Sequence, residues 1–509
     1  MKRSHFFIPM KKEVKTDPSA KSAAYAERIG LAHMIGSGMY THLPLGYKIF
    51  ANLKAVLTRH LLAAGCAEHQ FPAIQPLSVW KDSGRFEIFG SSIFVMKDQH
   101  GRDICLAPTH EVAAAYTAKC FIRSYRDLPV CISQIQTKFR DEARPRGGLI
   151  RTREFTMHDA YSFDTGIDSA AEGYEEIKRA YINTLIELRV PFTIRDQQDM
   201  GAIGGVKSHE FHVFADAGED HCPDPDSVEH NSLEIAHIFM LGEQHSKPIG
   251  ACYADRDGAL RPIFMCSFGM GIERTAVAFI ESYLRNGKDL LWSWALAPFK
   301  VMILGQSPYT TKLYRQLTES GYDTLLEDRD IPFSQQLREG FMLGLPVYCI
   351  FGRQFEANQQ VEIRVPLLNK VMAVDVEDVL PTLALLEQEI KGIELVRMTF
   401  NVLKIDFAAK NVYILFDKLW QLEHSYCQVL DVPTDLLGNY GKCQPESKQL
   451  KAGPFWLIPL HVNSGVMEPR MGGYKGIPYI DVPSSDPMHL DAVAKTYNSH
   501  WRLGKYKLT

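Results

Sequence analysis

The feature that most constrains the fold of this 509-residue chain is an arginine-rich segment, Gln134–Phe163. It begins as an alternating run, Gln134–Glu142, breaks at the Pro/Gly-rich loop Ala143–Gly148, and resumes as a β-rich run from Leu149. Such a pattern predicts an antiparallel hairpin. The hairpin carries five arginines, Arg140, Arg144, Arg146, Arg151 and Arg153.

Side chains alternate along a strand, so Arg140 and Glu142 are expected on one face of this hairpin. A guanidinium beside a carboxylate suits a ligand that has both anionic and donor groups, such as ATP. The alternative is a surface hairpin held by salt bridges, because a single motif carries a real risk of a false match.

Several segments, in order, resemble the class II aminoacyl-tRNA synthetases of the prolyl type. The hairpin resembles their motif 2. Gly36–Pro76 resembles motif 1, with a long helix and a strand ending at Pro72. Ala107–Glu111 (APTHE) resembles the Thr-x-Glu proline loop, Gly201–Phe211 the GGxxSHEF segment, and Met265–Glu281 motif 3. Ordered, independent matches are a stronger signal than any single match.

The resemblance implies an α/β fold in three blocks. Residues 1–290 would form an α+β catalytic domain with the antiparallel class II sheet, and residues 296–390 an α/β anticodon-binding domain. The pattern there predicts strands at Lys300–Leu304, Thr324–Glu327 and Val347–Phe351, and helices at Thr311–Ser320 and Phe333–Leu343. Asp328-Arg329 and Gly344-Leu345-Pro346 match fixed points of the family. Ser334–Leu337 (SQQL) replaces the usual Gly-x-Lys-Phe, which leaves the anticodon-reading residues open.

The third block, residues 396–509, lies outside the resemblance. Asn411–Val429 has helical apolar spacing, and the stretch from Pro454 to Pro483 favours short strands and turns. We interpret this extension as a structural appendage, the alternative being an independent activity.

Composition limits the class of protein. The net charge of −4 excludes a generally polybasic chain, so nucleic acid must be contacted by local basic patches. The 10 cysteines show no zinc spacing, so no structural zinc is expected, and reduced thiols fit a cytoplasmic protein. A mitochondrial matrix location is the alternative in a eukaryote. No apolar run is long enough to predict a membrane span.

For ATP, the resemblance implies roles that match the charge needed at a reacting phosphate. Arg140 would bridge the α-phosphate and the amino-acid carboxylate, and Arg274, at a helix start, would meet the γ-phosphate. Glu142 and Arg151 would contact the nucleotide, Phe155 would stack on adenine, and Glu234 would help to hold Mg²⁺.

For L-proline, the resemblance implies that Thr109 and Glu111 hold the ammonium. Met157 and Tyr161, with His209 nearby, are candidates for the wall around the ring, the alternative being ordinary core packing. Arg144 and Arg146 would approach the acceptor stem of the tRNA for proline, and motif 1 implies a homodimer.

The expected activity is therefore proline–tRNA ligation with ATP, Mg²⁺ and a homodimeric enzyme. Only about ten residues, His221–Asn231, stand where longer relatives carry an editing domain, which implies the compact bacterial or mitochondrial form. Two alternatives remain open: a paralogue that loads an amino acid onto an acceptor other than tRNA, and an inactive binding protein with the same fold.

Overall fold

A computed structural model of the chain describes residues 1–12, 14, 20–197, 205–223, 229–285 and 289–403, with five short strands after residue 450. Contacts divide the chain into two units. The first comprises Met1–Cys222 and His230–Leu380, and the second comprises Pro223–Glu229 and Pro381–Thr509. In these described ranges, no helix has both the length and the apolar character needed to cross a bilayer.

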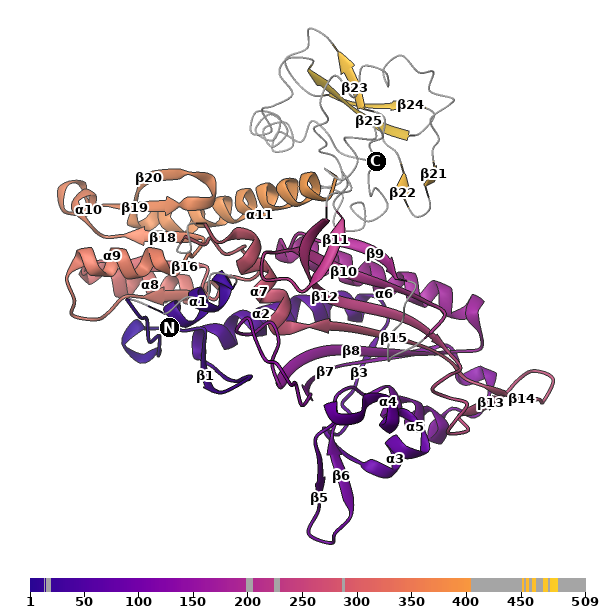
Figure 1. The fold of residues 1–509 in the computed structure, drawn as a ribbon. Helices are drawn as coiled ribbons and strands as arrows, with labels where there is room; N and C mark the ends of the chain where they lie inside the picture. The colour runs from indigo at the N-terminus through magenta and orange to yellow at the C-terminus, as the bar shows by residue number, and fades with distance from the viewer. Residues whose placement is uncertain are drawn as a thin grey trace. The chain divides into compact units, whose positions relative to one another are not determined.

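The first unit is built around an eight-stranded sheet (Figure 1). The strand order is β3-β7-β8-β15-β12-β10-β9, with β11 paired to β12. The strands are β3 (Ala67–Glu68), β7 (Val130–Phe139), β8 (Glu154–Asp164), β9 (Thr193–Gln197), β10 (Lys207–Phe214), β11 (Asp220–Pro223), β12 (Glu229–Gly242) and β15 (Phe264–Gly271). Neighbours from β7 to β9 are antiparallel, and β3 runs parallel to β7. The predicted α/β class with a large antiparallel sheet is confirmed.

The arginine-rich hairpin is formed by β7 and β8, but the loop between them is longer than the sequence predicts, because β7 ends before Glu142 and β8 begins after Leu149. β7 ends at Phe139 and β8 begins at Glu154, so Arg140, Glu142 and Leu149 lie in the connection. Cross-strand backbone bonds persist in the connection at Arg140–Arg153 and at the Arg146–Arg151 bridge, but between them the backbone N–H of Glu142 turns back to the Arg140 carbonyl at 2.7 Å. Arg140 and Glu142 both line one cavity, as the expectation of a shared side requires, but they do so from the connection and not by alternation along a strand.

Motif 1 contains the predicted long helix, α2 (Pro44–Ala63), with Pro44 at its first turn. Leu45, Ile49, Leu53 and Leu57 recur every four residues and are buried, as an amphipathic helix requires. The predicted strand to Pro72 does not form, because β3 ends at Glu68. Beyond it the polar groups of the Phe71 backbone bond to glutamine side chains of β7 in place of a backbone ladder.

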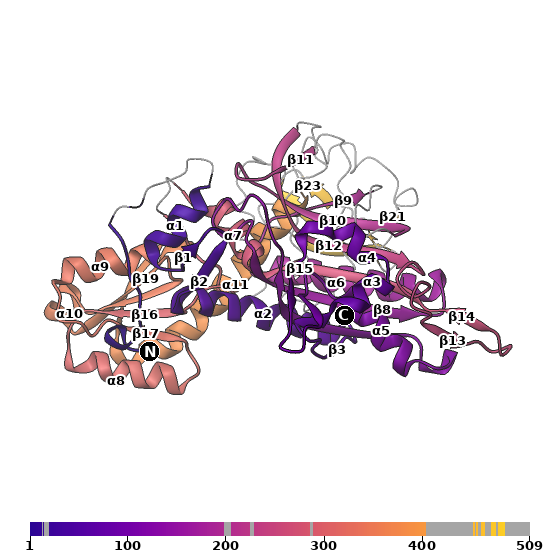
Figure 2. The ribbon, with the colours of Figure 1, turned by 60° about the horizontal axis from the view of Figure 1, so that its bottom comes forward.

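Helix α6 (Ile167–Leu188) covers one face of the sheet, and α2 packs against α6 and α7 (Ile272–Tyr283) (Figures 1 and 2). Tyr174 and Tyr181 of α6 meet this face, where Tyr181 hydroxyl lies 2.8 Å from Nδ1 of His158. Burying each large side chain contributes about 1.5–3 kcal/mol. Since side chains alternate, the residues next to His158 on β8 point to the opposite, uncovered face.

Smaller elements frame that uncovered face. A three-stranded sheet, β4-β6-β5, precedes α5, whose start carries the Thr-x-Glu loop. The elements are α1 (Lys21–Ile29), β1 (Ala32–Gly36), β2 (Met39–His42), β4 (Ile74–Pro76), α3 (Leu77–Asp82), α4 (Arg85–Phe89), β5 (Val95–Lys97), β6 (Asp103–Leu106), α5 (Glu111–Phe121), β13 (Cys252–Ala254) and β14 (Leu260–Pro262).

A second, five-stranded sheet completes the first unit, in the order β17-β16-β18-β19-β20. Its first three strands are parallel and the last two antiparallel to their neighbours. The elements are β16 (Val301–Leu304), α8 (Pro308–Glu319), β17 (Thr324–Leu326), α9 (Phe333–Met342), β18 (Val347–Ile350), α10 (Arg353–Asn358), β19 (Gln360–Val365) and β20 (Lys370–Asp375). All five elements predicted between Lys300 and Phe351 are confirmed within three residues at each end.

The beginning of the chain lies on the outer edge of this second sheet, beside β17 (Figure 2). Lys2 forms a parallel bridge with Leu326, whose backbone N–H donates to the Met1 carbonyl at 2.9 Å. The Ser4 backbone and hydroxyl both donate to Asp328, at 2.8 and 2.6 Å. The edge of the sheet is thereby covered by residues more than 300 positions away.

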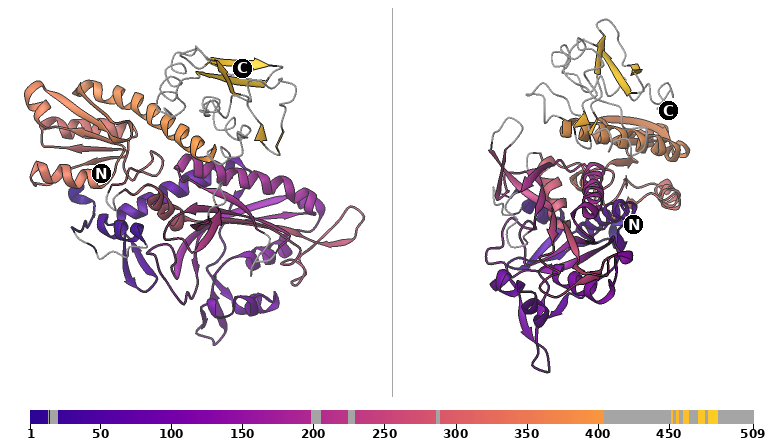
Figure 3. Two further views of the ribbon diagram at one scale, coloured as in Figure 1. Left: turned by 45° about the horizontal axis from the view of Figure 1, so that its top comes forward. Right: turned by 90° about the vertical axis from the view of Figure 1, so that its right-hand side faces the viewer.

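Helix α11 (Val379–Leu403) runs through the boundary expected near residues 390–396. The second unit also contains the short strands β21 (Lys451–Ala452), β22 (Phe455–Trp456), β23 (Leu460–Asn463), β24 (Arg470–Tyr474) and β25 (Ile477–Pro483), which appear in yellow in Figure 3. Short strands in this stretch were predicted. The predicted helix Asn411–Val429 lies outside the described residues.

Candidate functional site

A cavity of about 380 Å³ opens on the sheet face opposite α6. Residues of β8, β12 and β15 line it, together with the Thr-x-Glu loop, the motif 2 connection and the start of α7. It contains nine of the residues predicted for the site, Thr109, Glu111, Arg140, Glu142, Arg151, Phe155, Met157, Glu234 and Arg274. The sequence therefore identified most of one continuous site.

Two arginines bring positive charge to the cavity. Arg140 donates through Nε to the Pro108 carbonyl at 3.3 Å, and its guanidinium lies 5.2 Å from the centre of the Phe155 ring. Arg274, in the first turn of α7, donates to the carbonyls of Ile150 and Glu234 at 3.2 and 2.9 Å. Burial, and then the charge of Arg274, lower the pKa of Arg140. Within the described residues, neither guanidinium forms an ion pair, so both can meet an anionic ligand.

The motif 2 connection is a chain of ion pairs. Arg151 contacts Glu142 at 2.7 Å and Glu219 at 2.6 Å, and Glu219 also binds Arg146. Burial favours the neutral form of Glu142, but hydrogen bonds from Arg151 and from the Arg144 backbone lower its pKa overall. Arg144 and Arg146 are exposed at the tip of this loop and outside the cavity.

At the other end of the cavity, Glu111 begins α5 and is 5% exposed. The Thr109 hydroxyl donates to one of its carboxylate oxygens, and the Ser267 hydroxyl of β15 donates to the other at 3.0 Å. Two hydroxyls, neither of which carries a charge, hold this carboxylate in one orientation. Met157 lines the same end, as predicted for the wall of a small apolar pocket.

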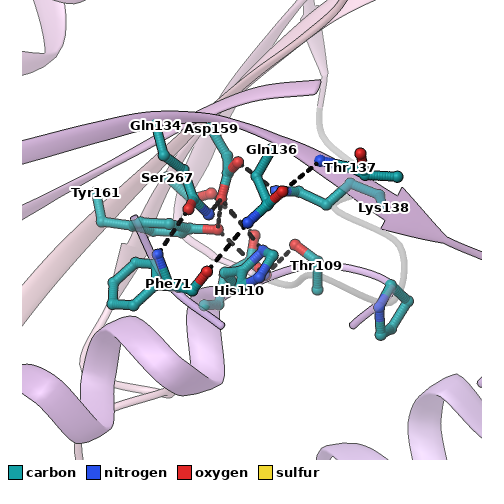
Figure 4. A network of polar contacts seen from close by, with 12 residues as sticks. Phe71, Thr109, His110, Gln134, Gln136, Thr137, Lys138, Asp159, Tyr161 and Ser267 are labelled. Carbon is teal, nitrogen blue, oxygen red and sulfur yellow. Dashed lines mark hydrogen bonds and ion pairs between the residues drawn. The ribbon is translucent and has the colours of Figure 1, made fainter. Parts of the chain in front are cut away.

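Another buried carboxylate, Asp159 of β8, also lines the cavity, and its place there was not predicted from the sequence. Figure 4 shows the side chains gathered around it. Lys138 of β7 forms an ion pair with Oδ1, while Gln134 and the Tyr161 hydroxyl donate to Oδ2 at 2.9 and 2.8 Å. Nδ1 of His110 lies 3.6 Å from Oδ2. Alternation along β7 and β8 was the signal that would have placed these residues on the face that carries Met157.

The structure corrects two members of the predicted proline wall. Tyr161 is fully buried beneath the cavity, where its hydroxyl accepts from the His110 backbone at 3.2 Å and donates to Asp159. His209 lies on the opposite face of the sheet: its Nδ1 is 2.6 Å from the Tyr174 hydroxyl of α6, and its Nε2 contacts Asp196. Its neighbour Glu210 faces the cavity side instead, opposite His237 on β12.

Glu210, Glu234 and His237 form a cluster whose ligand atoms all lie within 4.8 Å of one another. Nδ1 of His237 lies 3.0 Å from Oε1 of Glu234 and 3.7 Å from Oε1 of Glu210. Burial disfavours the charged form of Glu234, but His237 and then Arg274 lower its pKa overall. Carboxylate oxygens of this kind are suitable ligands for a hard divalent cation. Glu210 and His237 were missed as possible ligands.

The matched positions of the second sheet serve internal contacts. Asp328 accepts from Ser4, and Arg329 binds Glu327 and Glu339 at 2.6 and 2.8 Å. Gly344 adopts a left-handed conformation (φ +65°), and a Cβ atom there would lie 2.0 Å from the Leu290 carbonyl oxygen. In the divergent SQQL segment, Gln336 accepts from the Gly305 backbone at 3.0 Å. These contacts assign structural roles and leave the anticodon-reading residues undefined.

Comparisons with known proteins agree with this site. Residues 94–283, which include the whole lining of the cavity, match the model of the tRNA synthetase class II core domain (G, H, P, S and T). The chain is 32% identical to the proline–tRNA ligase of Wolbachia sp. subsp. Brugia malayi (strain TRS), over 74% of this chain and 98% of the relative. It is 33% identical to that of Rickettsia bellii (strain OSU 85-389), over 71% and 93%.

Among solved structures, the chain is similar to prolyl-tRNA synthetase from Cryptosporidium parvum. The complex with halofuginone and AMPPNP has a TM-score of 0.64 at 18% identity, covering 74% of this chain and 78% of the other. The complex with L-proline and AMP has a TM-score of 0.63 at 17% identity, covering 76% and 82%. At this identity the likeness concerns the fold.

Proposed function

The chain belongs to the prolyl-tRNA synthetase (proline–tRNA ligase) family of class II synthetases, and from this premise we propose how its cavity activates proline. In the first step a carboxylate oxygen of proline attacks the α-phosphorus of ATP. The bond to the bridging oxygen breaks, and pyrophosphate leaves. In the second step the terminal ribose hydroxyl of the tRNA attacks the carbonyl carbon of prolyl-adenylate, and AMP leaves.

The first step needs positive charge where negative charge gathers on phosphorus, and it needs no nucleophile from the protein. Arg140 is proposed to bridge the α-phosphate and the proline carboxylate, and Arg274, in the first turn of α7, to meet the γ-phosphate. Glu142 and Arg151 are proposed to contact the nucleotide, and Phe155 to stack on adenine. The support is that all five side chains line one cavity.

Glu111 is proposed to bind the secondary ammonium of proline, with Thr109 holding its carboxylate. Met157 is proposed to contact the ring. Tyr161 acts indirectly in this scheme, because its hydroxyl donates to Asp159 and it lies outside the lining of the cavity.

Mg²⁺ is proposed to accompany ATP, held by the carboxylates of Glu234 and Glu210. These two oxygen donors fit a hard cation, whereas the nitrogen of His237 fits it less well. Bound there, Mg²⁺ would neutralise phosphate charge. His237 is instead proposed to orient Glu234, with which it is in contact.

The observation that carries the proposal is the charge pattern of the cavity. Two arginines without an ion-pair partner among the described residues lie in the same lining as a carboxylate held by hydroxyls. This pattern fits a triphosphate beside an amino acid. The test is ATP–pyrophosphate exchange with each standard amino acid, followed by charging of total tRNA. Proline-dependent exchange followed by charging is expected. Exchange without charging would favour a different acceptor, and no exchange with any amino acid would favour a binding protein.

The exposed loop arginines are proposed to contact the acceptor stem through phosphates. Arg144→Ala should lower charging of tRNA about tenfold while proline-dependent exchange stays within about twofold, since a phosphate contact is made only in the second step. Arg146→Ala is a less clean test, because it also releases Glu219, which binds Arg151. Arg256→Ala, in the exposed turn between β13 and β14, is the control. Equal loss in both assays would mean that the loop serves the ATP site.

A homodimer is proposed from motif 1. The apolar stripe of α2 is already covered by α6 and α7, so a partner would meet other apolar side chains, such as Ile35 (73% exposed) and Ile74 (56% exposed). Light scattering should give twice the chain mass of 57.6 kDa, and Ile35→Glu with Ile74→Glu should shift it to the monomer. Leu260→Glu, 75% exposed on β14, is the control. A monomer for the unmodified chain at micromolar concentration would contradict the proposal.

Two further proposals concern the domain boundaries and the location of the protein. We propose residues 1–290 as the catalytic domain, residues 296–390 as the anticodon-binding domain and residues 396–509 as an appended segment. The bacterial relatives support a cytoplasmic location.

A further inference from the structure

Three buried carboxylates, Glu111, Asp159 and Glu273, lie in the lining of the same cavity. Glu273, beside Arg274 in the first turn of α7, accepts from the Thr156 backbone at 2.9 Å, and the partners of the other two differ in charge. Glu111 is bound by the hydroxyls of Thr109 and Ser267. In the described part of the chain, no basic side chain lies within ion-pair distance of Glu111. Asp159, by contrast, forms an ion pair with Lys138 and accepts hydrogen bonds from Gln134 and Tyr161. The two groups therefore present different net charges to a ligand.

Lys138 is entirely buried, which is rare for lysine unless it is paired. It lies outside the lining of the cavity, and Asp159, with which it forms an ion pair, is its strongest electrostatic partner, ahead of Glu111. The Lys138–Asp159 pair is neutral as a whole wherever its shared proton resides. His110, whose Nδ1 lies 3.6 Å from the same carboxylate, adds no charge near neutral pH, because burial lowers its pKa to about 4.

We propose that Lys138 is an internal counter-ion that neutralises Asp159, so that of these two carboxylates only Glu111 offers a free negative charge to the amino acid. The pocket then matches a substrate with one ammonium group and an uncharged side chain, such as proline. Lys138 is a positioning and specificity residue in this scheme, and the scheme rests on the proposed role of Glu111. A second unneutralised carboxylate would give the pocket one negative charge more than the single ammonium of the substrate can balance.

The test compares Lys138→Met, Asp159→Asn and the double variant in proline-dependent ATP–pyrophosphate exchange. Each single change leaves one buried charge without its partner, so each should raise the KM for proline about tenfold or more. The KM for ATP should stay within about twofold. The double variant restores neutrality and should return the KM for proline to within about threefold of the unmodified enzyme, which is the signature of a coupled pair.

The matched control is Lys97→Met, which removes a lysine from another Lys–Asp pair on neighbouring strands, 2.6 Å from Asp103 but exposed to solvent. It should leave the KM for proline within about twofold. If one single variant does not fold, the other single variant and the double variant carry the test, since a neutral pair of similar size is tolerated.

A double variant whose proline KM stays raised tenfold or more would overturn the proposal, as would single variants that raise the two KM values equally or raise neither. The proposed function has a separate readout. If the unmodified enzyme shows no exchange with proline, that function fails, and if Glu111→Gln leaves the proline KM unchanged, the Glu111 assignment fails independently of the Lys138–Asp159 cycle.

Discussion

Replacing Arg140 with alanine should lower the rate of proline-dependent ATP–pyrophosphate exchange about a hundredfold or more, as the loss of one preorganised charge at a transition state does. Arg140 lines the cavity without an ion-pair partner among the described residues, held by the Pro108 carbonyl and the face of Phe155. The charge that develops on the α-phosphate during attack would lose its nearest guanidinium. The effect should appear mainly in kcat, because the interaction strengthens as that charge develops.

The measurement is exchange at saturating ATP and proline, with Arg256→Ala as the control. Arg256 also lies over an aromatic ring, 5.2 Å from the centre of Tyr125. Unlike Arg140, it is exposed and lies outside the lining of the cavity. Arg140→Lys should recover only part of the rate, since an ammonium cannot make the bidentate contact of a guanidinium. An unchanged rate in Arg140→Ala would remove Arg140 from the chemical step.

Glu111→Gln should raise the KM for proline about thirtyfold or more, in the range expected when one member of a buried, hydrogen-bonded charge pair is removed. The amide keeps the shape of the side chain and can still accept a hydrogen bond from Thr109 or Ser267. The change therefore removes the charge and leaves most of the packing. The KM for ATP should change little, because Glu111 is not among the side chains assigned to ATP.

The control for this substitution is Glu87→Gln, an exposed glutamate in the first turn of α4. Melting temperature should be measured beside the kinetics. A variant that keeps its proline KM but loses stability would show that Glu111 fastens the start of α5 to β15 and does not bind the ammonium.

The sequence predicted the elements that depend on local pattern. The resemblance to motif 1 predicted a long helix, found as α2 with an apolar residue every fourth position from Leu45 to Leu57, and short apolar runs between polar helices predicted β16, β17 and β18. Motif matches located nine members of the cavity, because such motifs combine a fixed backbone geometry with the residue types that the chemistry needs.

Residues that depend on register were not predicted. Lys138 and Asp159 are 21 positions apart, and they meet only because β7 and β8 pair in the register that places Gln134 opposite Asp159. The predicted place of His209 near the proline wall was wrong for a related reason. His209 and Glu210 are neighbours on β10, and a shift of one position decides which face of the sheet a side chain occupies. The pairing of β10 with β12 also shifts by a residue between Phe211 and His212, so alternation along β10 does not stay in step with alternation along β12. Alternation along each strand gives the face of a side chain, but neither composition nor spacing gives the register that brings side chains of two strands together.

The covering of β17 by the first residues of the chain has a consequence for the order of events during synthesis. Met1 and Thr324 are 323 positions apart in sequence, yet their backbones are bonded at 2.7 Å. At a translation rate of about 5–20 residues per second, the first segment waits roughly 15–65 s for its partner strand to be made. The catalytic sheet is translated entirely within that interval. Residues 1–4 therefore remain without their strand partner while the catalytic sheet is made, and the edge of β17 is sealed by a segment synthesised more than 300 residues earlier.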